Sequence, residues 1–289
     1  MQVSKAVITA AAPNQDRLPL QQLVCPRGND KTALQLIVEE TISAGIDEIC
    51  VVIRPGAQIG YEQAAGEHLA ALQFVQQPEP LGYADAIYRA KDFVGDDPFL
   101  HLVGDHLYLS KSDQPCAKQL IQAAKDHECS VSAVQATREN KLPYFGIVNG
   151  SRIPRHERVY EVNRVVEKPT PTFAEQELVT PGLRAGHYLG FFGMHVLTSE
   201  IMVAIESLVA AGDGNRATLS DALEVLRTRQ KYMAYEVQGT RYNLGVQYGL
   251  LIAQLAIGLS GKHRDLILTE MVDLLANRSD IQTGVVQDQ

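Results

Sequence analysis

Apolar residues in the first half of the chain fall in short runs that alternate with amphipathic stretches. Runs of apolar, often β-branched residues predict buried strands at 6–9, 49–53, 74–75, 99–103 and 129–135. Helical spacing predicts helices at 33–44, 61–72, 83–93 and 114–125. Strands that alternate with helices predict an α/β fold with a mostly parallel sheet and right-handed crossovers, in which ligands bind beyond the carboxyl ends of the strands.

The second half of the chain has a different pattern. Strand-like segments at 145–148, 158–166 and 189–196 predict a small β-rich subdomain that closes one side of the site. Helices at 201–208 and 220–226 and a strand at 232–237 follow. Two apolar helices, 244–259 and 265–275, are separated at Gly261, and a polar tail covers 279–289.

Composition narrows the class of protein. The chain has 289 residues, of which 45% are hydrophobic, so it can bury a large core. A net charge of −8 argues against a nucleic acid or an anionic membrane as partner, since both need a basic face. The four cysteines form no C-x-x-C pair, and the apolar run ending at Ala12 is too short for a signal sequence. We therefore expect a soluble, cytoplasmic protein.

Four short motifs occur in a fixed order at 77–82 (QPEPLG), 104–106 (GDH), 166–169 (VEKP) and 219–222 (LSDA). This series resembles the sugar-nucleotide pyrophosphorylases, most closely the bacterial UTP–glucose-1-phosphate uridylyltransferases. The resemblance extends from Val3 to about Ser260. It implies a Rossmann-like nucleotidyltransferase fold of the glycosyltransferase A type. It also implies formation of a nucleoside-diphosphate sugar and pyrophosphate from UTP and a sugar-1-phosphate, with glucose-1-phosphate as the first candidate.

The same resemblance divides the chain. It implies a nucleotidyltransferase domain at 1–260, with a nucleotide-binding part at about 1–140 and a sugar-phosphate part at about 141–245. The C-terminal helices would then occupy 246–278, before the tail at 279–289. Among relatives such helices form dimer or tetramer contacts, so a homo-oligomer is expected, and packing of the helices back onto the core is the alternative.

The loop after the first strand departs from the family. Residues 9–17 read TAAAPNQDR where the resemblance expects A-A-G-x-G-T-R, so Ala12 and Asn14 occupy the two glycine positions. Ala11 and Ala12 are the expected contacts to the nucleotide phosphates. A left-handed conformation at Ala12 would cost about 1–2 kcal/mol, and a different path around Pro13 is the alternative.

Two cations are candidates for phosphoryl-transfer chemistry. Asp16 falls on the family's arginine position and Arg17 follows it. Either the loop shifts by one residue so that Arg17 serves as the catalytic cation, or turnover is lost or slight. Loss of an arginine finger costs on the order of 10³–10⁵ in rate. Lys31 matches a later lysine of the family pattern and is the second catalytic candidate.

The resemblance assigns base recognition to Gln77 and Gly82. An amide supplies both a donor and an acceptor, as a pyrimidine edge requires, and the glycine lets the base approach the backbone. An ordinary Pro-Gly turn before a helix is the alternative. Ala84 and Asp85 stand where the family usually has glycine and histidine.

The resemblance also implies a magnesium site, in which Asp105 and Asp221 bind one Mg²⁺ that bridges the sugar phosphate and the nucleotide. Asp105 ends an apolar strand, where an α/β protein would hold a metal. Asp105 also counts among the nucleotide-binding residues. For Asp221 the alternative is an acidic residue that stabilises a helix N-terminus.

Three residues are implied for the sugar phosphate. Glu167 would bind sugar hydroxyls, Lys168 the phosphate, and Gly146 would clear space for the sugar. A β-bulge is the alternative role for the glycine. Asn243 stands where the family motif usually has aspartate.

Two functions follow from these observations. The first is a magnesium-dependent uridylyltransferase of small molecules. The second is a catalytically weak or inactive homologue that binds a nucleotide or sugar phosphate as a regulatory or structural partner. The altered loop favours the second, and the paired aspartates favour the first.

Overall fold

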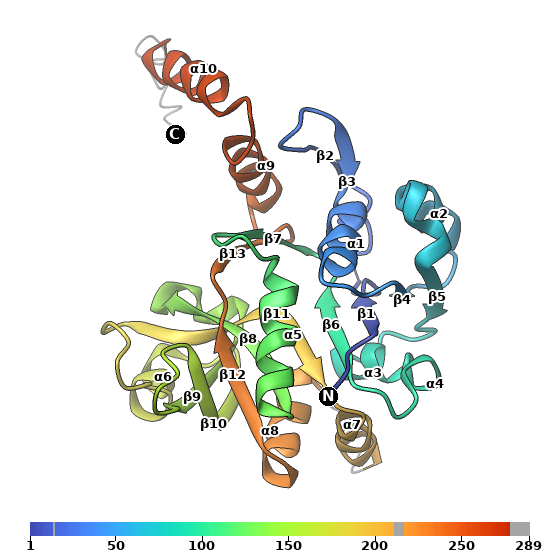
Figure 1. Cartoon of the computed structure of the whole chain (residues 1–289), viewed down its shortest axis with the longest axis vertical. Helices are drawn as coiled ribbons and strands as arrows, with labels where there is room; N and C mark the ends of the chain where they lie inside the picture. Colours follow the sequence, from blue (N-terminus) through green and yellow to red (C-terminus); the bar gives the residue numbers. More distant parts are fainter. Residues whose placement is uncertain (14, 211–216, 278–289) are drawn as a thin grey trace, which may run out of the picture.

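The protein is built around one nine-stranded sheet (Figure 1). The computed structural model describes residues 1–13, 15–210 and 217–277. The strand order is β5-β4-β1-β6-β11-β8-β12-β10-β9. The bounds are β1 Lys5–Thr9, β4 Glu48–Ile53, β5 Leu72–Gln76, β6 Phe99–Val103, β8 Ser130–Arg138, β9 Gly146–Arg152, β10 Val159–Glu167, β11 His187–Leu197 and β12 Tyr232–Glu236.

The strand directions agree with the predicted α/β fold. Strands β5, β4, β1 and β6 are parallel neighbours, and β12 is parallel to β8. Strand β11 is antiparallel to β6 and β8, and β10 is antiparallel to β12 and β9. All strands of this sheet except β10 and β11 therefore run in one direction, and their carboxyl ends meet at one edge.

Helices cover both faces of the sheet. Along β1, Ala6 and Ile8 pack into one core cluster and Val7 into another, as the period of two along a strand requires. The first cluster includes residues of α1 (Ala33–Ser43) and α5 (Cys116–His127). The second includes residues of α3 (Tyr83–Tyr88), α7 (Glu200–Ala210) and α8 (Leu219–Arg229).

The β-rich stretch forms one flank of the same sheet. Strands β9 and β10 end the strand order, and β9 also pairs with β11. A third core cluster lies beside them and takes in residues of the 3₁₀ helix η2 (Glu139–Tyr144) and of α6 (Pro171–Glu177). This flank thus has a small core of its own, although its strands continue the central sheet.

Two small antiparallel sheets were not expected from the sequence. One is the hairpin of β2 (Gln22–Val24) and β3 (Asp30–Thr32), and the other pairs β7 (His106–Ser110) with β13 (Gly239–Asn243).

Two predicted helices are each interrupted. Residues 61–72 are divided between α2 (Gln58–Ala65), the 3₁₀ helix η1 (Gly66–Ala71) and the start of β5, and 83–93 between α3 and α4 (Lys91–Val94). Gly66 has a φ of 55°, a value that ends a right-handed helix.

The C-terminal helices α9 (Gly249–Leu259) and α10 (Arg264–Ala276) extend beyond the sheet, at the top of Figure 1. Helix α9 begins five residues later than predicted. The amide oxygen of Asn243 accepts a hydrogen bond from the Gly245 N–H (2.7 Å), and Tyr248 has a φ of 61°, so the chain turns before the helix starts. The predicted tail at 279–289 lies outside the described residues. Among the described helices, none has the length and apolar character needed to span a bilayer.

Candidate active site

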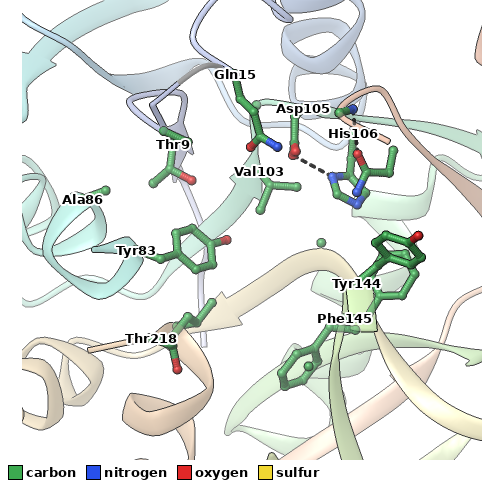
Figure 2. A pocket seen from close by; sticks show the side chains of 18 of the residues that line it. Thr9, Gln15, Tyr83, Ala86, Val103, Asp105, His106, Tyr144, Phe145 and Thr218 are labelled. Atoms are coloured by element: carbon green, nitrogen blue, oxygen red, sulfur yellow. Dashed lines mark hydrogen bonds and ion pairs between the residues drawn. The ribbon is translucent and has the colours of Figure 1, made fainter. Parts of the chain in front are cut away.

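A cavity of about 630 Å³ opens at the carboxyl edge of the sheet. Thr9 and Val103, the last residues of the parallel strands β1 and β6, lie side by side in its wall. In Figure 2 the Tyr83 ring points into the same space. The position agrees with the rule that ligands of α/β sheets bind beyond the carboxyl ends of the strands.

The cavity brings together most of the residues singled out in the sequence. Eight of the predicted site residues line it: Ala11, Ala12, Gln77, Gly82, Asp105, Gly146, Glu167 and Lys168. Three others are absent from its described lining: Arg17, Lys31 and Asp221. The four motifs therefore converge on one site, whereas the predicted catalytic cations do not face it.

The loop after β1 follows the path around Pro13 that was left open as an alternative. Ala12 is not among the described residues with a positive φ, so the strain considered for it does not arise. Its carbonyl accepts a hydrogen bond from the Gln15 N–H (3.1 Å), and that of Gln15 accepts from Leu18 (2.9 Å). A series of turns thus replaces the glycine cradle. Asn14 lies outside the described residues.

Asp16, Arg17 and Lys31 are all absent from the described lining of the cavity. The Asp16 carboxylate lies 3.4 Å from the Arg54 guanidinium and is absent from the described lining of the cavity, so it adds no negative charge to that wall. Arg17 is exposed to solvent. Lys31, on β3, forms an ion pair with Glu39 of α1. The catalytic roles of Arg17 and Lys31 stay predictions, and both would require movement of the loop or hairpin.

Asp105 and His106 form a hydrogen-bonded pair in the cavity wall (Figure 2). The Asp105 Oδ1 lies 2.7 Å from the His106 Nδ1. Burial opposes ionisation of Asp105, but the neighbouring His106 and Lys168 outweigh it and lower the pKa of the carboxyl group below its usual value. Gly104 precedes the pair, and a Cβ there would lie 2.9 Å from the Thr9 carbonyl oxygen. Glycine therefore lets this turn pass closely over the end of β1.

Asp221 has a structural partner. Its Oδ2 accepts hydrogen bonds from the Thr218 N–H (2.9 Å) and hydroxyl (2.7 Å), which completes a capping box at the start of α8. This is the helix-terminus role held open as the alternative. Of the two aspartates, only Asp105 is part of the described lining of the cavity. The pairing of Asp105 with Asp221 around one metal ion stays a prediction.

Asn243 is the polar residue that the fold places beside Asp105. The Leu244 N–H donates to the Asp105 carbonyl (2.8 Å), and Asn243 pairs with His106 between β13 and β7. Both Asp105 and Asn243 line the cavity. One carboxylate and one amide oxygen fit a Mg²⁺ ion that completes its coordination with water and substrate phosphates.

Glu167 is positioned by Ser220. The Ser220 hydroxyl donates to the Glu167 Oε2 at 2.6 Å, while the other carboxylate oxygen lies 3.4 Å from the Lys168 Nζ. Gly146 pairs regularly with Glu167 across β9 and β10, so it is not a bulge. A Cβ at Gly146 would lie 2.5 Å from the Ser220 Oγ. The glycine therefore makes room for the hydroxyl that holds Glu167.

Two buried histidines lie beneath the cavity. His195 lines it, and its Nδ1 lies 2.6 Å from the Ser132 Oγ. The His101 Nε2 lies 3.2 Å from the Thr9 Oγ1. Burial lowers the pKa of His195 to about 3, and burial together with His195 lowers the pKa of His101 well below its usual value. Both imidazoles are therefore neutral at physiological pH and contribute no positive charge to the site.

The described lining holds little positive charge. Lys168 is its only lysine or arginine, and it shares the wall with the carboxylates of Asp105 and Glu167. Its backbone has a φ of 45°, an uncommon conformation for a residue other than glycine. A phosphate entering the described site would meet Lys168 as its principal cation.

Several lining residues were not singled out from the sequence. Ser220 lies in the fourth motif, next to the predicted metal ligand Asp221. Tyr83 directly follows the first motif, and its burial raises its pKa well above the usual value, with Asp105 adding to the shift. Phe145 adjoins the Gly146 element, and the Arg241 guanidinium stacks on its ring at 3.7 Å. The closeness of these residues to the motifs in the sequence is the feature that could have identified them as part of the site.

The fold and the cavity define the class as an α/β protein with a ligand site at the carboxyl edge of its sheet. Residues 19–243 match the nucleotidyl transferase family model. The chain belongs to this family.

Curated relatives agree along nearly the whole chain. A UTP–glucose-1-phosphate uridylyltransferase of Bacillus subtilis, YngB, is 30% identical over 89% of this chain and 90% of its own length. A protein of the same name from Streptococcus pyogenes serotype M3 is 30% identical over 86% of each chain.

Solved structures agree on the fold. A UTP-bound UGPase from Acinetobacter baumannii has a TM-score of 0.73 at 23% identity and covers 95% of this chain and 100% of its own. A UDP-glucose pyrophosphorylase in complex with UDP-glucose has a TM-score of 0.72 at 22% identity and covers 88% of this chain and 98% of its own.

Proposed function

We propose that this chain joins UTP to a sugar-1-phosphate, with glucose-1-phosphate as the first candidate, and releases pyrophosphate. The observation that carries this proposal is the convergence of the four motifs on one cavity at the carboxyl edge of the sheet. The curated relatives named as UTP–glucose-1-phosphate uridylyltransferases support the choice of substrates.

The reaction needs no covalent intermediate with the protein, so catalysis depends mainly on how the two substrates are positioned. An oxygen of the sugar-1-phosphate attacks the α-phosphorus of UTP, and the bond to the β-phosphate breaks so that pyrophosphate leaves. Gln77 and Gly82 hold the base, and Glu167, oriented by Ser220, holds sugar hydroxyls. Lys168 neutralises phosphate charge. Correct placement of two bound reactants alone contributes a large part of such an acceleration.

The proposed reaction also uses a divalent metal ion, Mg²⁺. Asp105 would hold it, with the amide oxygen of Asn243 beside it. When bound, the ion neutralises phosphate oxygens and favours the developing charge of the leaving group. An aspartate–asparagine pair carries one negative charge less than two aspartates, so we expect weaker Mg²⁺ binding than a dicarboxylate site would give.

The test is phosphate release from UTP and glucose-1-phosphate in the presence of Mg²⁺ and a pyrophosphatase. We expect release that depends on both substrates and falls at least about 100-fold in Asp105→Ala, because removal of one strong electrostatic contact costs about 3 kcal/mol or more in such sites. Asp47→Ala is the matched control, since it removes an exposed carboxylate that does not line the cavity. UTP binding without release would favour the non-catalytic, ligand-binding homologue instead.

The remaining properties are consistent with a cytoplasmic, self-associating enzyme. The cysteines Cys25, Cys50, Cys116 and Cys129 are buried free thiols, as a reducing compartment favours. The described part of α10 has no buried residue and exposes large apolar side chains, which supports contact with a second copy of the chain.

A further inference from the structure

The side-chain amide of Gln77 has its nitrogen fixed by two acceptors. Gln77 is only 5% exposed, and its Nε2 donates to the Gly82 carbonyl oxygen at 3.0 Å and to the Asp85 Oδ2 at 2.8 Å. A carbonyl and a carboxylate can only accept hydrogen bonds, so the NH₂ group and not the oxygen must face them. Both amide protons are therefore committed inside the protein.

Asp85 is itself held in place. It is 7% exposed, and its Oδ1 and Oδ2 lie 2.7 Å and 3.3 Å from the Nη2 and Nε of Arg89, one turn further along the helix. A two-pronged contact of this kind fixes the plane of a carboxylate as well as its position. The Arg89–Asp85 pair thus prevents the Gln77 amide from turning over.

With the Gln77 amide fixed, two polar groups of the described cavity wall are left without a partner. The Gln77 Oε1 has no hydrogen-bond partner among the described residues, and neither has the Gly82 N–H. Both residues line the cavity. The wall therefore offers one acceptor and one donor. A base edge with an N–H beside a carbonyl complements this pair, as the N3–H of uracil and thymine does. Cytosine has a lone pair at N3, which would face the Oε1 lone pairs.

We propose that Asp85 is a positioning residue that makes this site selective for a base with an N3–H. It acts through Gln77 and does not itself touch the base. The inference rests on the proposed function only in taking the cavity to be a nucleotide site. The inference goes beyond the proposed function by assigning discrimination against cytosine to the carboxylate of Asp85, which stands where the family usually has histidine.

The test compares binding of UTP and CTP, each with Mg²⁺, by isothermal titration calorimetry. We expect the natural chain to prefer UTP by roughly 5- to 150-fold, since an unpaired buried acceptor facing a lone pair costs about 1–3 kcal/mol. In Asp85→Leu only the Gly82 carbonyl still accepts from the amide nitrogen, so the amide turns more readily and the preference for UTP should fall at least about threefold. Asp85→Ala carries the same expectation should the leucine variant fail to fold.

Two further variants separate positioning from structural damage. Asp85→Asn retains an oxygen that accepts from the Gln77 amide, so it should keep the preference for UTP. Asp92→Asn, which removes an exposed carboxylate on the next helix, should leave both affinities unchanged. A structural defect would weaken UTP and CTP equally and leave their ratio intact.

The outcomes distinguish this inference from the proposed function. Equal binding of UTP and CTP by the natural chain, or an unchanged ratio in Asp85→Leu, would overturn the inference even if turnover occurs. A ratio that collapses in that variant supports the inference even if no pyrophosphate is released. If neither UTP nor CTP binds, the inference is overturned as well.

Discussion

The buried imidazole of His195 makes a sharp prediction about stability in acid. Burial holds its pKa at about 3 in the folded protein, against 6.5 for an ordinary histidine. Between these two pH values the unfolded chain binds a proton at this site and the folded chain does not. The free energy of unfolding therefore falls as the pH falls below about 6.5, and the stabilisation by the neutral imidazole is fully present only above that value.

The magnitude follows from the linkage relation. Each pH unit between the two pKa values is worth about 1.4 kcal/mol, so lowering the pH from 6.5 to 5 removes about 2 kcal/mol through this one group. Glutamine at this position retains a hydrogen bond to Ser132 but has no proton to take up. We expect His195→Gln to be less stable than the natural chain at pH 7, and the gap to narrow by about 2 kcal/mol at pH 5.

The assay is urea unfolding followed by circular dichroism at pH 7, 6 and 5, because the chain has no tryptophan to report by fluorescence. His263→Gln is the matched control, since it replaces an exposed imidazole. A gap between His195→Gln and the natural chain that stays constant with pH would refute the reasoning. A constant gap would mean that the imidazole takes up a proton as readily in the folded protein as in the unfolded chain.

Three further predictions concern the site and the C-terminal helices. Lys168→Ala should lower kcat/KM by on the order of 100-fold, with Lys118→Ala as the exposed control, and an effect under threefold would mean that another cation serves the phosphates. Asp221→Ala should lower the unfolding free energy by about 1 kcal/mol through loss of the cap, whereas a rise in the Mg²⁺ concentration needed for turnover would point to the metal role. Replacement of both Leu274 and Leu275 by serine should convert an oligomer into a 31.7 kDa monomer in sedimentation velocity, and a natural chain that already sediments as a monomer would exclude this contact.

Strands with a strong apolar pattern could be predicted from the sequence, and short polar strands could not. The strand β13 reads GTRYN and pairs with β7, about 130 residues earlier in the chain. Nothing local in such a segment signals a strand, because its conformation comes from a distant partner. The predicted helix at 244–259 began too early for a related reason, since the side chain of Asn243 makes a turn that apolar spacing does not reveal.

The site was predictable where it depends on strand ends and not where it depends on the direction of a side chain. Asp105 follows the parallel strand β6, and the carboxyl ends of parallel strands meet at one edge of a sheet. In the fourth motif, Ser220 faces the cavity while Asp221 turns back to cap its helix. Adjacent polar residues at a helix start point in different directions, so spacing alone did not decide between them. The exposed position of Arg17 follows from the path of a loop without glycines.

Phosphorus NMR of one mixture tests the central claim most directly. The purified chain is incubated with UTP, glucose-1-phosphate and Mg²⁺, and the spectrum is followed over time. The account predicts growth of pyrophosphate and UDP-sugar signals in equal amounts as the two substrate signals decline, and no such change with Asp105→Ala. A spectrum that stays unchanged, from protein shown to bind UTP in the same buffer, would contradict it.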